Sequence, residues 1–148
     1  MGERYMLRRV WEKWAPPLVG PSEKPLTGVA LLNLASDPPF RFYSLLMEQE
    51  GLSLKAAEVR PLVESIQEKR LHVDYFNIGS NRYVVTSIHE HIYCGRCLNS
   101  VNPAGSGAII ACTPFNAIVA TYDGSIGAAS KAMATVETFF DHLTQSFA

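Results

Sequence analysis

The residues best suited to chemistry lie in one short stretch that holds two histidines and two cysteines, His89-Glu-His-Ile-Tyr-Cys-Gly-Arg-Cys97. Imidazole nitrogens and thiolates are the usual ligands of structural zinc, and a Cys-x-x-Cys pair can also cycle between dithiol and disulfide. The residue types therefore allow a metal-binding or redox module centred on His89–Cys97.

The element that must position these side chains argues against both chemistries. The stretch from Ile92 to Leu98 has the pattern of a strand, in which successive side chains point to opposite faces. Four ligands would converge there only with a bulge or a sharp turn. A redox Cys-x-x-Cys normally opens a helix in a βαβ unit, which this strand-rich half of the chain lacks. We therefore expect ordinary strand thiols and loop histidines, with no metal and no cofactor, and keep the metal or redox module as the alternative.

Other signs of catalysis are weak. The sequence has neither a glycine-rich phosphate loop with its lysine nor a Gly-x-Ser-x-Gly nucleophile elbow. Its acidic residues are scattered and offer no obvious general acid and base pair. We therefore expect a protein that is not an enzyme.

Composition and charge limit the remaining classes. The chain has 148 residues, of which 47% are hydrophobic and 18% charged, which predicts a single globular domain over residues 1–148. The net charge of −1 excludes a general affinity for nucleic acid. No apolar run approaches the roughly 18 residues of a membrane span. The odd number of cysteines, 3, indicates the reduced thiols of a cytoplasmic protein.

Hydrophobic periodicity predicts the order of the elements. Turn residues and short connections between the strands imply an antiparallel sheet with helices on its faces, an α+β fold. Pro16 and Pro17 should end the first helix, and Pro61 means that the middle helix either starts near Arg60 or is kinked. We expect helices over Met1 to Leu18, Leu54 to Glu68 and Ala129 to Leu143, and strands over Gly28 to Leu34, Phe40 to Met47, Val73 to Ile78, Arg82 to Ile88, Ile92 to Leu98, Gly107 to Thr113 and Phe115 to Tyr122.

Aromatic residues gather on the two end helices. Trp11 and Trp14 lie one turn apart on one face of the first helix. Phe139 belongs to the buried stripe of the last helix, whereas His142 lies just beyond the edge of that stripe. If the two helices pack side by side, these rings form a shallow aromatic groove. Such a groove suits a polyproline II segment, which is already extended and loses little entropy on binding.

With these motifs in order, the chain resembles a divergent profilin over nearly its whole length. The opening Trp-x-x-Tyr of that family is matched by Trp11-Glu-Lys-Trp14, and its first hairpin by Gly28 to Tyr43. Further matches are Lys55-Ala-Ala-Glu-Val59 at the start of the middle helix, Ile78-Gly-Ser-Asn-Arg-Tyr83 at the Gly-Gly-x-Lys-Tyr turn, Cys112-Thr113 at the Lys-Thr position, and Val136-Glu-Thr-Phe-Phe-Asp-His-Leu143 at the end of the chain.

The resemblance implies a fold and a function. The fold would be an antiparallel sheet of about seven strands, with the N- and C-terminal helices packed together on one face. The protein would bind monomeric actin and proline-rich segments of actin regulators, and so regulate filament assembly and sequester monomers in the cytoplasm and cytoskeleton. Phosphoinositide head groups would be a further partner. A profilin-fold scaffold that has lost actin binding is the alternative.

The resemblance also implies two sets of site residues. The polyproline groove would be lined by Trp11, Trp14, Tyr43, His142 and Phe147. The actin-binding face would contain Arg82, Arg96, Ile126, Lys131 and Glu137.

Departures from the family pattern carry consequences. Phe140 replaces a small residue beside the groove, so the packing of the end helices must adjust to a larger ring. Ser87 and Cys94 stand at two basic positions of the actin face, which predicts weaker electrostatic steering. Residues 1–8 form a short N-terminal extension to which the resemblance assigns no role.

Overall fold

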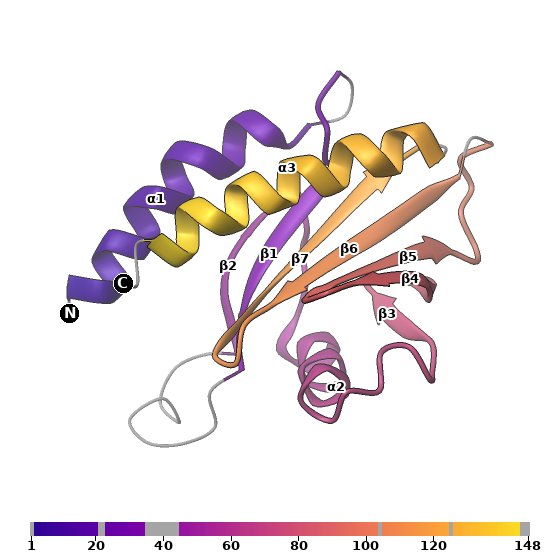
Figure 1. The fold of residues 1–148 in the computed structure, drawn as a ribbon, viewed down its shortest axis with the longest axis horizontal. Coiled ribbons are helices and arrows are strands. Elements are labelled where there is room, and N and C mark those ends of the chain that lie inside the picture. The colour runs from indigo at the N-terminus through magenta and orange to yellow at the C-terminus, as the bar shows by residue number, and fades with distance from the viewer. Residues whose placement is uncertain (1, 21–22, 35–44, 104, 125, 146–148) are drawn as a thin grey trace.

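A computed structural model describes residues 2–20, 23–34, 45–103, 105–124 and 126–145 of the chain. Within these ranges the sheet has seven strands in the order β2-β1-β7-β6-β5-β4-β3, and every neighbouring pair is antiparallel. The helices α1 and α3 cover one face, and α2 lies on the other (Figure 1). The elements are α1 (Gly2–Leu18), β1 (Gly28–Asn33), β2 (Leu46–Glu50), α2 (Ala56–Gln67), β3 (Phe76–Ile78), β4 (Asn81–His89), β5 (Ile92–Cys97), β6 (Ser106–Cys112), β7 (Asn116–Asp123) and α3 (Ile126–Gln145).

This architecture confirms the predicted fold class and order of elements. The central strands β6 and β7 are buried along nearly their whole length, because helices cover the sheet on both sides. Alternate side chains of these strands enter two different cores. Ile109 and Ile118 pack beneath α1 and α3, whereas Ile110 and Val119 pack on the face that carries α2.

The prolines interrupt their helices less than predicted. The helix α1 continues through Pro16 and Pro17 to Leu18, so the prediction that they end it is wrong. Both lie in the last turn, where each ring removes one helical hydrogen bond and fixes φ near the helical value. The helix α2 begins at Ala56 and includes Pro61, so a start near Arg60 is also wrong.

Two strands differ from their predicted bounds. The described part of β2 runs on to Glu50, whereas residues 40–44 of the predicted strand lie outside the described ranges. The strand β3 starts at Phe76, three residues later than predicted. A turn occupies the chain before it, in which Lys69 has a φ of 57° and the Val73 amide donates to the Arg70 carbonyl at 3.0 Å. None of the helices in the described ranges has the length and hydropathy that a bilayer span requires.

Candidate functional site

The helices α1 and α3 run in opposite directions, side by side, across one face of the sheet (Figure 1). Apolar residues at helical spacing hold them there: Leu7, Trp11 and Ala15 of α1 are buried in the same core as Val136 and Phe139 of α3. Burial of these side chains fixes the position of both helices, and therefore of any ring that projects from their common edge.

Two ring pairs join the helices. Trp11 contacts Phe139 with ring centroids 5.4 Å apart and planes tilted by 46°. Trp14 and His142 stack with centroids 4.0 Å apart and planes within 14° of parallel. Trp11 is 3% exposed and Phe139 is 1% exposed, whereas Trp14 and His142 are only half-buried. The Trp14–His142 stack therefore offers flat aromatic surface to solvent, and the other pair belongs to the core.

The predicted groove residues accordingly divide into three groups. Trp14 and His142 are brought together at the surface, as the packing of the end helices predicts. Trp11 is buried against Phe139, so its ring belongs to the core beneath the Trp14–His142 stack. Tyr43 and Phe147 lie outside the described residues.

A cation next to the stack was not among the predicted site residues. The ammonium group of Lys13 lies 5.6 Å from the centre of the Trp14 ring, within the range of a cation–π contact. Its place beside Trp14 in the sequence is the only signal that could have indicated this contact. The exposed stack thus carries positive charge at one side.

The large ring of Phe140 does not come between the end helices. It is 8% exposed and stacks on His91 of the β4–β5 turn, with centroids 5.1 Å apart. The Trp14–His142 distance of 4.0 Å shows that α1 and α3 remain in close contact. The packing adjusts to Phe140 at the β5 side of α3, away from the groove.

The two arginines of the predicted actin-binding face lie on the side of the sheet that α3 covers. Arg96 of β5 lies opposite Val84 of β4, and Arg82 lies two residues before Val84 on β4. The three side chains therefore share one face of the sheet. Arg82 is exposed. The Arg96 guanidinium donates to the Tyr122 hydroxyl at 3.3 Å and to the Gly124 carbonyl at 3.0 Å, which anchors it to the end of β7.

The predicted residues of α3 do not all join that face. Glu137 lines a hollow of about 440 Å³ together with Met133, Asp141 and the turn residues 89–92. Lys131 is exposed, but six residues separate it from Glu137, which places it about 120° away around the helix. Ile126 begins α3, and its side chain lies outside the described part of the structure.

The His89–Cys97 stretch does not assemble into a metal or redox site. The Cys94 thiol lies 3.6 Å from the Met133 sulfur on the α3 face, whereas Cys97 packs against the core on the α2 face. Within the described residues, no three His, Cys, Asp or Glu side chains are placed to hold a metal ion. Burial raises the pKa of Cys94, and it raises the pKa of Cys112 to about 12, so neither thiol favours the reactive thiolate.

Comparison with known proteins agrees with this geometry. The family model described as Profilin matches residues 11–147. Profilin II of Acanthamoeba castellanii superposes with a TM-score of 0.57 at 16% identity, over 83% of this chain and 88% of that one. Mouse profilin IIa in complex with a double repeat from the FH1 domain of mDia1 gives a TM-score of 0.57 at 9% identity, over 88% and 96%. LokiProfilin1, in its complex with rabbit actin, gives a TM-score of 0.52 at 9% identity, over 94% of each chain. No curated protein sequence matches the chain.

Proposed function

Because the chain belongs to the profilin family, we propose that it binds proline-rich segments in the polyproline II conformation on the edge between α1 and α3. The observation that carries this proposal is the half-buried stack of Trp14 on His142, with ring centroids 4.0 Å apart. The buried core beneath fixes both rings before a ligand arrives, so little ordering entropy is lost on binding. Proline rings can then pack on aromatic surface that is already in place.

We further propose that the opposite side of α3, with the exposed ends of β4 and β5, binds monomeric actin and so regulates filament assembly in the cytoplasm and cytoskeleton. Arg82 and Glu137 are exposed on this side of the sheet, and Arg96 is held there by Tyr122 and Gly124. The neighbouring folds include a profilin bound to rabbit actin and a profilin bound to an FH1 repeat. Phosphoinositide head groups are a third proposed partner, on the family resemblance alone.

Titration with a proline-rich decapeptide tests the groove. We expect the peptide to change the tryptophan fluorescence of the protein, because Trp14 lies in the proposed contact. Trp14→Ala and His142→Ala should each abolish binding measured by calorimetry. Glu137→Gln, on the other side of α3, is the matched control and should bind normally. Undiminished peptide binding in both groove variants would overturn the assignment of the groove.

An actin assembly assay tests the second surface. Excess protein should lower the amount of filament that sediments, and a double change of Arg82→Ala and Glu137→Ala should weaken this effect. Trp14→Ala should leave it unchanged, because that ring lies on the α1 side of α3. Unchanged filament mass at high excess of the unaltered protein would favour the alternative, a profilin-fold scaffold without actin binding.

A further inference from the structure

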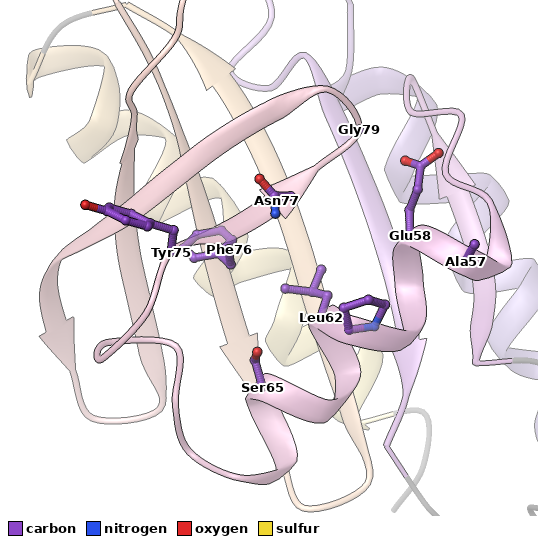
Figure 2. A pocket seen from close by; sticks show the side chains of 9 residues that line it. Ala57, Glu58, Leu62, Ser65, Tyr75, Phe76, Asn77 and Gly79 are labelled. Carbon is purple, nitrogen blue, oxygen red and sulfur yellow. The ribbon is translucent and has the colours of Figure 1, made fainter.

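A second groove lies on the opposite face of the sheet from the Trp14–His142 stack. The strand β3 is the last in the sheet order, so one of its edges has no neighbouring strand within the described ranges. The helix α2 packs beside β3, and a hollow of about 310 Å³ lies between residues of the two elements (Figure 2). Its walls come from Ala57, Glu58, Pro61, Leu62 and Ser65 of α2 and from Tyr75, Phe76, Asn77 and Gly79 at the edge strand.

The backbone of β3 presents unpaired groups to this hollow. A two-residue turn connects β3 to β4, with Gly79 at a φ of 61°, and Ile78 pairs with Asn81 on either side of it. In an antiparallel ladder, hydrogen-bonded pairs alternate with pairs that are not hydrogen-bonded. Asn77 and Arg82 form the latter kind of pair, so the amide and carbonyl of Asn77 point away from β4. They face the side where a further strand would add.

At its other wall the hollow carries one buried acceptor, a carboxylate oxygen of Glu58. The Oε2 atom of Glu58 is buried and makes no hydrogen bond to any residue that the structure describes. Glu58 stands at the third position of α2, from which a carboxylate often bonds the amide before the helix, here Lys55, but no such bond forms. A buried carboxylate oxygen without a donor is destabilising, and a ligand that supplies one relieves this.

We propose that this groove binds an extended peptide segment of a partner protein that carries an arginine or lysine. The peptide backbone pairs with the free edge of β3 at Asn77, and the basic side chain donates to Glu58. Leu62 and Phe76, which lie between α2 and β3, supply the apolar floor (Figure 2). A charge-assisted bond to a shielded carboxylate explains the choice of a basic residue, and the edge strand explains the extended backbone.

The site is independent of the proposed groove between the end helices. The two lie on opposite faces of the sheet, as the positions of α2 and of the α1–α3 pair show (Figure 1). Occupation of one therefore leaves the other open. Such a protein can hold two different segments at once, which extends its proposed function from binding a proline-rich ligand to connecting it with a second partner.

Titration of the ¹⁵N-labelled protein with a blocked Thr-Val-Arg-Val-Thr peptide, followed by NMR, tests the proposal. We expect shifts in the amides of Ala57, Leu62, Asn77 and Gly79. Replacing the peptide's arginine by glutamine should weaken binding by about tenfold or more, because a charged hydrogen bond is lost. Glu58→Gln should do the same at nearly unchanged side-chain volume. Glu64→Gln, an exposed acid on the same helix, is the matched control and should bind like the unaltered protein.

The remaining outcomes decide against the proposal. Absence of groove shifts at millimolar peptide would overturn it, as would equal affinity for the arginine and glutamine peptides. Blocked arginine alone binding as tightly as the peptide would indicate a small-cation site. Groove shifts that appear on concentrating the protein without peptide would make a second copy of the chain the occupant. Trp14→Ala should leave the titration unchanged, so failure of the proline-rich groove and failure of this one remain distinguishable.

Discussion

The two ring pairs between α1 and α3 have the same spacing but different surroundings. Trp11 and Trp14 are three residues apart on one helix, as Phe139 and His142 are on the other. The first pair is almost fully buried over the sheet, and the second is half-buried at the edge. The difference shows that depth in the helix–sheet packing, and not residue type, assigns one tryptophan to the core and the other to the half-buried edge where we propose the binding surface.

Removal of the inner ring should have the largest effect on stability. Trp11→Ala deletes a side chain that is 3% exposed, packed against Phe139. We expect the free energy of unfolding to fall by about 3–5 kcal/mol, the usual range for a buried aromatic replaced by alanine. Chemical denaturation measures this loss. A change below about 1 kcal/mol would contradict the assignment of Trp11 to the core.

Removal of the Phe140 ring should lower the stability of the protein without changing the affinity for a proline-rich peptide. The ring is 8% exposed and packs on His91 at the rim of the core, so Phe140→Ala should cost about 3 kcal/mol, the lower end of the usual range for a buried phenylalanine. Affinity for the proline-rich decapeptide should remain, because this ring lies away from Trp14 and His142. Calorimetry on the folded variant is the measurement. A peptide affinity that falls together with the stability would show that Phe140 supports the groove after all.

Removal of the Trp14 ring should have the opposite effect: peptide binding is lost and stability changes little. Trp14→Ala deletes a half-buried ring whose main partner is the His142 imidazole. The ring pair contributes about 0.5–1.5 kcal/mol beyond the area that it buries, and only part of the Trp14 ring is buried, so the free energy of unfolding should fall by less than in Trp11→Ala. The same denaturation experiment on Trp11→Ala and Trp14→Ala compares the two positions directly. Equal losses of stability would remove the distinction between the two ring pairs.

Much of the fold could be predicted because apolar residues recur at every second position in strands and at every third or fourth position in helices. The element order and the antiparallel sheet follow from that pattern. The late start of β3 could not be predicted, because Val73 and Tyr75 fit the alternating pattern of a strand, whereas the backbone still turns between Lys69 and Val73. The prolines were misjudged because their effect depends on which turn of a helix they occupy and on the packing that holds that helix.

The candidate site could be predicted from the sequence less well than the fold. Helical spacing places Trp11 and Trp14 on one face, but only the position of α3 over the sheet decides which of them is covered. The histidine- and cysteine-rich stretch shows the converse. Its residue types suggest chemistry, whereas strand alternation sends Cys94 and Cys97 to opposite faces. The groove beside Glu58 exists because β3 is an edge strand, and that depends on the order of the whole sheet.

The smallest expected effect concerns the cation beside the outer ring. Lys13 lies 5.6 Å from the Trp14 ring centre, and a cation–π contact at an exposed site contributes about 0.5–1 kcal/mol. If this contact helps to hold Trp14 in the orientation that binds the peptide, Lys13→Gln should lower the affinity for the proline-rich decapeptide by about two- to fivefold. Lys13→Arg keeps the charge and should bind normally. Calorimetry measures the affinity of both variants. An equal loss of affinity in the two would mean that the lysine side chain contacts the peptide itself. Unchanged affinity in Lys13→Gln would mean that the Trp14–His142 stack is sufficient for binding without the cation.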